Sequence, residues 1–326
     1  MINSIYPWQD KAWDGLRSKR ERMPHALLIH GAQGIGKLQL AERFVQSLLC
    51  ESLDARGEPC GECAGCRWFG AGSHPDFRWV EPEALARPSA SGGDADEPAA
   101  VRATKPSLEI KVDQIRALDD FLNLKSHRAG ARVALIHPAE AMNPNAANAL
   151  LKALEEPPGR AQFILVSHRP ARLLATIRSR CVAVPIPLPD AGASLAWLES
   201  QGTNDAASWL AFASGSPLLA LRYASEAGAT LARRRQALEA GDFDALGAVN
   251  DREQLEELAE VLQRHALDMA FATYCGRAKY GSSAGSPDGG AWLRYARLMG
   301  RNRALARHPL NPRLFAAEML AAMPGK

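Results

Sequence analysis

The sequence predicts an α/β domain with a parallel sheet, followed by a region that is helical throughout. From His25 to about Pro187, short apolar runs alternate with amphipathic stretches, which is typical of parallel strands connected by helices. After Pro189 the strand pattern disappears and amphipathic helical patterns replace it. Because the chain has 326 residues, more than one ordinary domain, we expect two or three domains.

The first strand and the helix after it define the start of the sheet. The apolar run HALLIHG (25–31) predicts a strand, and after Gly36 apolar residues recur at helical spacing, which predicts a helix directly behind it. Each further strand is an apolar run bounded by proline, glycine or polar residues. Four more strands are expected, at 76–82, 131–137, 162–168 and 181–187.

The domain boundaries follow from changes in composition. We expect a first domain over 1–187, a small helical domain over 188–228 and a helical C-terminal domain over 229–326, with a weak break near Gly228. Within the first domain, the stretch 84–107 is rich in Ala, Ser, Gly, Asp and Pro. Such a composition buries too little apolar surface to order itself, so we expect a mobile surface insertion there.

Composition and the N-terminal sequence exclude few functions. The chain is 47% hydrophobic and 23% charged, as in globular proteins, and its net charge of +3 neither requires nor excludes a nucleic-acid partner. The start of the sequence lacks the features of a signal peptide, and no apolar run approaches the ~20 residues of a membrane helix. We therefore expect a cytoplasmic protein without membrane contact.

The segment GAQGIGKL (31–38) matches the G-x-x-x-x-G-K spacing of a phosphate-binding P-loop. Backbone N–H groups of such a loop can cradle phosphates, and the lysine ammonium can meet their charge. A strand, a glycine-rich turn and a helix are the context that a P-loop requires, which disfavours a chance glycine turn. The candidate nucleotide-binding residues are Gly31, Gly34, Gly36 and Lys37.

The groups that a working P-loop uses for hydrolysis are missing here. Leu38 stands where Ser or Thr would bind Mg²⁺. In ALIHPAE (134–140), His137 and Pro138 occupy the positions of the metal-binding aspartate and of the acid that activates water. We therefore expect no ATP hydrolysis at this loop, and whether it still holds ATP or ADP stays open.

Four of the six cysteines lie close together in the sequence. Cys50 is followed by CGECAGC, which contains Cys60, Cys63 and Cys66. Two thiolates of a C-x2-C knuckle reach one ion without strain, and four thiolates close a tetrahedral Zn²⁺ site with no open position for water. We predict a structural zinc module at 50–66, with an iron–sulfur cluster or four free thiols as alternatives.

A family resemblance emerges from these motifs together with four others. They are YPW (6–8), NAANALLKALEEPP (145–158), SRC (179–181) and HPLNPRL (308–314). The chain resembles the AAA+ clamp-loader subunits of bacterial replicases, and within them the delta-prime type of DNA polymerase III. The resemblance implies an AAA+ P-loop domain, a helical lid and a helical collar for oligomerisation. It also implies a hetero-pentamer with gamma/tau ATPase subunits and delta, which loads the sliding clamp onto primed DNA.

The same resemblance implies that Arg180 of SRC is an arginine finger, delivered to the ATP of a neighbouring subunit, and that Ser179 orients its turn. The chemistry is general: phosphoryl transfer builds charge on the γ-phosphate oxygens, and a guanidinium supplied in trans can be worth ~10³–10⁵ in rate. Arginine suits this task because its planar fork donates to two oxygens at once.

Two other functions remain open: an active gamma/tau-like ATPase of the same loader, and a zinc-containing DNA-binding module. The missing hydrolytic groups disfavour the first, and the near-neutral charge disfavours the second. Glu155 and Glu156 resemble a catalytic pair, but adjacent helix positions do not face each other, so we expect a capping or interface role. The chain shows no polymerase metal site, so DNA polymerase activity would belong to the assembly.

Overall fold

The computed structural model describes residues 5–86, 106–123, 131–225, 228–278, 288–306, 308 and 310–325. The chain divides into two compact units, Met1–Leu188 and Pro189–Lys326. Each unit is described by itself below. The further division of the second unit near Gly228 stays a prediction.

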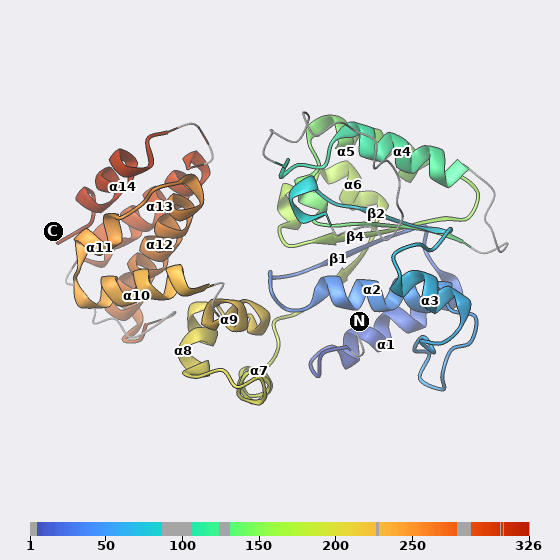
Figure 1. Ribbon diagram of the computed structural model, residues 1–326, viewed down its shortest axis with the longest axis horizontal. Helices are drawn as coiled ribbons and strands as arrows, with labels where there is room; N and C mark the ends of the chain where they lie inside the picture. The colour runs from blue at the N-terminus through green and yellow to red at the C-terminus, as the bar shows by residue number, and fades with distance from the viewer. Residues whose placement is uncertain are drawn as a thin grey trace. The chain divides into compact units, whose positions relative to one another are not determined.

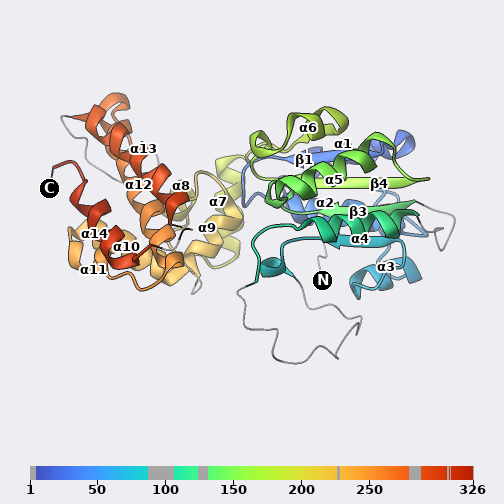
Figure 2. The same ribbon diagram turned by 90° about the horizontal axis from the view of Figure 1, so that it is seen from above.

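The first unit contains a five-stranded sheet in which every neighbouring pair of strands is parallel (Figures 1 and 2). The spatial order is β2-β3-β4-β1-β5. The strands are β1 (Ala26–His30), β2 (Phe77–Val80), β3 (Arg132–Ile136), β4 (Ala161–Ser167) and β5 (Val182–Pro185). All five lie where the sequence predicts them, which confirms the α/β fold class with a parallel sheet.

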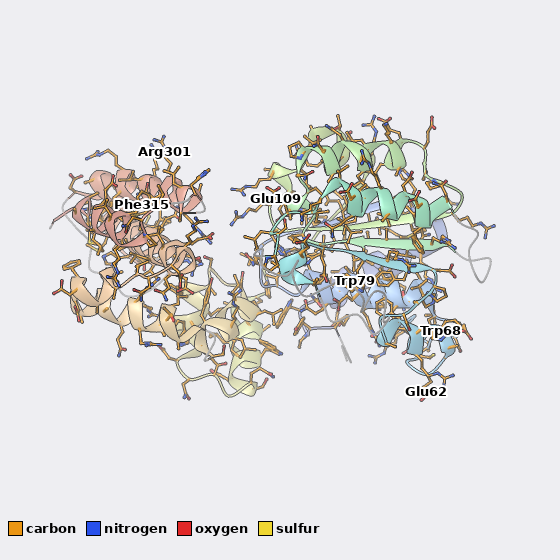
Figure 3. The ribbon with its side chains drawn as sticks, turned by 45° about the horizontal axis from the view of Figure 1, so that its top comes forward. Glu62, Trp68, Trp79, Glu109, Arg301 and Phe315 are labelled. Atoms are coloured by element: carbon orange, nitrogen blue, oxygen red, sulfur yellow. The ribbon has the colours of Figure 1, made fainter. Side chains whose placement is uncertain are left out.

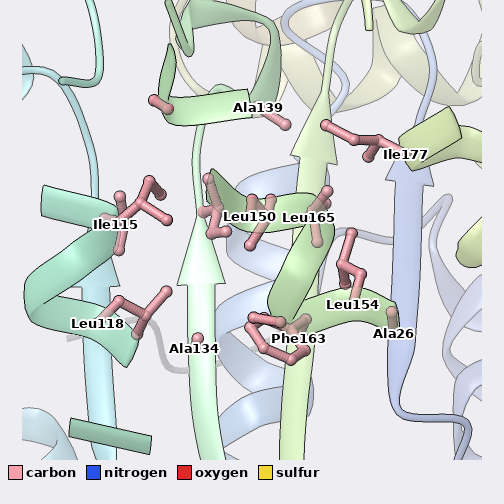
Figure 4. Packing of buried hydrophobic residues seen from close by; sticks show 14 of the residues in the cluster. Ala26, Ile115, Leu118, Ala134, Ala139, Leu150, Leu154, Phe163, Leu165 and Ile177 are labelled. Atoms are coloured by element: carbon pink, nitrogen blue, oxygen red, sulfur yellow. The ribbon is translucent and has the colours of Figure 1, made fainter. Parts of the chain in front are cut away.

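Helices cover both faces of this sheet, and its three central strands β1, β3 and β4 are buried almost throughout (Figure 1). In β1, Ala26 and Leu28 join one core, whereas Leu27 and Ile29 join the other, as the twofold period of a strand requires. The helices of the unit are α1 (Asp10–Lys19), α2 (Lys37–Leu49), α3 (Ala64–Gly70), α4 (Val112–Asn123), α5 (Pro144–Glu155) and α6 (Ala175–Arg180), and short 3-10 turns are η1 (Arg20–Arg22), η2 (Glu83–Leu85), η4 (Ala139–Ala141) and η5 (Pro170–Arg172). The first core contains residues of α4, α5 and α6, shown from close by in Figure 4, and the second contains residues of α1 and α2.

The second unit is helical throughout its described residues, as the sequence predicts. One small core joins residues of α7, α8 and α9, and a larger one joins residues of the helices from α10 to α14. The helices are α7 (Ala191–Ser200), α8 (Ala206–Phe212), α9 (Pro217–Ala224), α10 (Ala229–Ala240), α11 (Phe243–Gly247), α12 (Arg252–Cys275), α13 (Gly289–Leu305) and α14 (Pro312–Ala321). No helix in the described part of the chain is long and apolar enough to cross a membrane.

The predicted insertion at 84–107 is described only at its two ends. Its start forms η2, and the backbone N–H of Ala84 donates to the carbonyl of Ser107 at 3.0 Å. Lys111 joins the two ends by an ion pair with Glu83 at 2.6 Å. The prediction of mobility concerns residues 87–105, which lie outside the described residues.

The α5 core position Leu150 tests the packing of the first unit. Its side chain is fully buried among the residues of Figure 4, so Leu150→Ala leaves a cavity that should lower the free energy of unfolding by about 2–5 kcal/mol. Urea unfolding measures the change. Asn148→Ala on the exposed side of the same helix is the control and should stay within about 0.5 kcal/mol of the wild type. Equal stability of the two variants would contradict this packing.

Candidate functional site

The phosphate loop connects the end of β1 to the first residue of α2. Gly36 has φ of 83°, and a Cβ there would lie 2.5 Å from Cδ2 of Tyr6. A Cβ on Gly31 would lie 2.3 Å from the carbonyl oxygen of Ile186. Both positions therefore require glycine, and Gly34, with φ of 79°, shares the left-handed backbone.

The YPW motif lies against this loop. The rings of Tyr6 and Trp8 stack with their centroids 4.9 Å apart, and Trp8 Nε1 donates to the carbonyl of Ile35 at 3.0 Å. Gln9 Nε2 donates to the same carbonyl, also at 3.0 Å. The sequence marks YPW as a family motif but gives no sign of this contact, because it joins residues about 27 positions apart.

Lys37 is buried and turned toward its own loop. Its side chain is 2% exposed, and its ammonium donates to the carbonyl of Ala32. Burial lowers the pKa of Lys37 to about 8, although the carboxylate of Glu140 acts in the opposite direction. The charge that would meet a phosphate is therefore partly satisfied within the chain.

Two imidazoles lie beside this lysine, at the carboxyl ends of β3 and β4. The Nε2 atoms of His137 and His168 are 3.2 Å apart. Burial, followed by the charges of Lys37 and its neighbours, lowers the pKa of His168 to about 3, so this imidazole is neutral at pH 7. Mg²⁺ prefers oxygen ligands in octahedral geometry, which an imidazole pair does not supply. Leu38, the other substituted position, packs against the core.

Glu140 is a residue of this site that the sequence reading misses. Its Oε1 accepts hydrogen bonds from the backbone N–H groups of His168 at 3.0 Å and Arg169 at 3.1 Å. The carboxylate thus fixes the loop after β4 and lies near the charge of Lys37. Glu140 lies three residues after His137, just past the end of β3. This closeness to the expected site is the sequence signal that could have identified Glu140 as a site residue.

The four cysteines converge as predicted. One sulfur from each of Cys50, Cys60, Cys63 and Cys66 lies within 4.8 Å of the others. The Sγ of Cys50 is 3.6 Å from that of Cys60 and 3.9 Å from that of Cys63. Four sulfurs about 2.3 Å from a tetrahedral ion would lie about 3.8 Å apart, so the spacing of the four sulfurs fits a metal site.

Local backbone geometry favours a thiolate at Cys63, in the module that Figure 3 marks with Glu62, whereas burial raises the pKa of Cys50 and of Cys66. Burial raises the pKa of Cys63, but N–H groups of Glu51 and Cys66 donate to its sulfur, and the pKa falls to about 7. Gly65 is required because a Cβ there would lie 2.3 Å from the carbonyl oxygen of Leu49.

Arg180 is the last residue of α6, immediately before β5. Its Nη2 pairs with Oε1 of Glu155 at 2.6 Å, and its Nη1 donates to the carbonyl of Thr176 at 3.0 Å. The hydroxyl of Ser179 donates to the same carbonyl at 3.0 Å. Cys181 packs against the core, where burial raises its pKa to about 11.

Arg180 lies at the amino ends of the parallel strands, whereas the phosphate loop lies at their carboxyl ends. β1 and β5 are parallel and in register, with Leu27 beside Val182 and His30 beside Pro185. Arg180 precedes β5, whereas the loop follows β1. At ~3.3 Å per residue, the three steps from Leu27 to His30 alone separate the two edges by about 10 Å. The structure therefore does not bring Arg180 together with Lys37 and the glycines.

Sequence comparison decides the family. A model of the family described as "DNA polymerase III, delta subunit" matches residues 8–190. The chain belongs to this family. It is 44% identical to DNA polymerase III subunit delta' of Pseudomonas aeruginosa over 222 residues, which are 67% of this chain and 61% of the relative. It is 33% identical to subunit delta' of Escherichia coli over 66% of this chain and 60% of the relative.

The match therefore spans less than two thirds of these delta' relatives. Among solved structures, a gamma subunit-related protein of DNA polymerase III from Thermotoga maritima aligns with a TM-score of 0.51 and 18% identity. The alignment covers 95% of this chain and 97% of that one, which supports the family's P-loop fold with its helical C-terminal region.

Five arginines in the second unit of this delta family member illustrate two different environments. Arg234 pairs with Glu257, and Arg235 lies 5.3 Å from the ring centroid of Trp209, so both serve internal contacts. Arg294, Arg297 and Arg301, the last labelled in Figure 3, lie on exposed positions of α13.

Lys37 should make the stability of this delta family member depend on pH. Its pKa is about 8 in the folded chain against an ordinary 10.5, so between these values the unfolded chain binds more protons and folding stability rises with pH. Lys37→Met removes this contribution. Urea unfolding at several pH values should show a flatter rise than in the wild type, whereas the exposed control Lys152→Met should keep the rise. If the free energy of unfolding of Lys37→Met rises with pH as steeply as that of the wild type, buried Lys37 is not the source of the pH dependence.

Proposed function

We propose that this protein is a delta-prime-like subunit of the DNA polymerase III clamp loader, which hydrolyses no ATP itself and supplies Arg180 to a neighbouring ATPase subunit. The observation that carries the proposal is the position of Arg180 at the sheet edge opposite its own phosphate loop. From there it cannot serve a nucleotide in its own loop. A nucleotide that it contacts would belong to another chain.

The chemistry of the loop supports the first half of the proposal. Leu38 offers no oxygen to Mg²⁺, and His137 and Pro138 stand at the end of β3 where the metal-binding aspartate and the acid that activates water would lie. The imidazole of His168 lies beside that of His137. Lys37 is already held by a carbonyl of its own loop. These features also disfavour the alternative of a gamma/tau-like active ATPase, which needs a hydroxyl at position 38 and an acid at position 137.

The proposed partners follow from the family and from the names of its relatives. A clamp loader built with gamma/tau ATPase subunits and a delta subunit would place Arg180 against a neighbour's triphosphate and load the sliding clamp onto primed DNA in the cytoplasm. We propose a hetero-pentamer, in which 188–228 acts as lid and 229–326 as collar. Ser179 would orient the turn that carries Arg180.

For the cysteine cluster we propose a structural Zn²⁺ held by Cys50, Cys60, Cys63 and Cys66. The sulfur spacing fits a tetrahedral ion, and four protein ligands leave no position for a reacting water. The ion would stabilise the module behind α2, where Arg43 pairs with Glu58 at 2.7 Å.

Arg180→Ala tests the proposed function directly. In a complex reconstituted with the ATPase and delta subunits, the variant should assemble normally, because a partly exposed ion pair such as that of Arg180 with Glu155 adds little to stability. The DNA-stimulated ATP turnover at the neighbouring site should fall by up to ~10³-fold, since the guanidinium stabilises the transition state. Steady-state ATPase and clamp-loading assays measure the loss.

Arg178→Ala is the matched control, because Arg178 lies exposed on the same helix two residues earlier. It should hydrolyse ATP and load clamps as the wild type does. If Arg180→Ala also loads clamps and hydrolyses ATP at the wild-type rate, the trans role is wrong.

Cys63→Ser tests the zinc assignment. The purified wild-type chain should contain about one Zn²⁺, whereas Cys63→Ser should lose most of it and melt at a lower temperature, because metal binding stabilises the folded module. Elemental analysis and thermal unfolding measure both effects. Cys275→Ser is the control, since Cys275 lies outside the cluster and should leave the metal content unchanged. Iron with visible absorption in place of zinc would overturn the assignment.

A further inference from the structure

The guanidinium of Arg180 is held by two acceptors of its own chain. One is Oε1 of Glu155, the last residue of α5, at 2.6 Å, and the other is the carbonyl of Thr176 at 3.0 Å. These contacts engage two of the five N–H donors of the planar fork, and the other three have no hydrogen-bond partner among the described residues. The side chain is 34% exposed, so the fork is not enclosed by the protein.

Glu155 and Arg180 stand on helices that the core holds rigidly. Leu154, the residue before Glu155, is 2% exposed, and Ile177, three residues before Arg180, is fully buried. Both belong to the same core cluster and are labelled in Figure 4. Since α5 and α6 pack together, the backbone of Glu155 has a fixed position relative to the backbone of Arg180.

The ion pair is better suited to orienting Arg180 than to stabilising the fold. The two side chains are 34% and 50% exposed, and ion pairs so close to water contribute little to stability. A free arginine side chain samples many rotamers, and this freedom is lost when the guanidinium meets a phosphate. A carboxylate that already restricts the guanidinium reduces the entropy lost on binding a phosphate. The remaining N–H donors must still point outward to reach that phosphate.

We propose that Glu155 is the positioning residue of the arginine finger. Its carboxylate holds Nη2 of Arg180, and the unused N–H donors are presented to the anionic triphosphate bound by the neighbouring subunit. This inference rests on the proposed trans role of Arg180. Of the adjacent Glu155 and Glu156, only Glu155 has this positioning role, because Arg180 pairs with Glu155.

The test uses the reconstituted clamp-loader complex with ATP, primed DNA and the sliding clamp. Glu155→Ala should lower kcat for ATP by about 10-fold with little change in KM, because a misplaced catalytic group costs up to ~10²-fold in rate. Glu155→Gln keeps an acceptor oxygen at the same position and should recover most of the rate. Glu156→Ala is the matched control and should behave as the wild type. Complex assembly and the melting temperature of the chain should stay unchanged in all three variants.

The double variant Glu155→Ala/Arg180→Ala separates positioning from other effects. If Glu155 acts only through Arg180, the double variant should be no slower than Arg180→Ala alone. A further loss of rate would show that Glu155 acts on another group and would overturn the proposal.

Two other results distinguish this proposal from the proposed function. If Arg180→Ala is impaired while Glu155→Ala has the wild-type kcat or a higher one, the positioning role is wrong and the trans arginine stands. If Arg180→Ala itself is unimpaired, the proposed function fails, and the positioning role fails with it.

Discussion

The parallel pairing of β1 with both β4 and β5 is the constraint on which the rest of the structure depends. It places the phosphate loop at the carboxyl edge of the sheet and Arg180 at the amino edge. It also brings the C-terminus of α5 to the start of β4, next to α6, so that Glu155 meets Arg180. The phosphate loop and Arg180 therefore lie at opposite ends of the strands of one sheet.

At the carboxyl edge, charge is balanced within the chain. Lys37 is buried and its ammonium donates a hydrogen bond to the carbonyl of Ala32. The carboxylate of Glu140 lies near enough to raise the pKa of Lys37. The Nε2 atoms of His137 and His168 lie 3.2 Å apart. A hydrolytic site needs instead an ammonium and oxygen ligands that await Mg²⁺ and triphosphate. The glycine backbone of a P-loop is retained, whereas the groups that drive cleavage are replaced.

Much of this could be predicted from local sequence patterns. The strands, the glycine-rich turn, the cysteine spacing and SRC each depend on residues close together in the chain, so their patterns are readable. The contact of Trp8 with the loop, the role of Glu140 and the pairing of Glu155 with Arg180 join distant residues. Only the folded sheet brings these groups together, and an adjacent glutamate pair gives no sign of which member is used.

The most direct measurement of the central claim compares ATP turnover by the purified chain alone with turnover by the ATPase subunits before and after the chain is added. We expect no magnesium-dependent hydrolysis by the lone chain and an increase when it joins the ATPase subunits, because Leu38 and His137 offer no oxygen to Mg²⁺ and Arg180 lies at the other end of the strands from the loop. Rapid magnesium-dependent hydrolysis by the lone chain would show that its own loop is a working ATPase site.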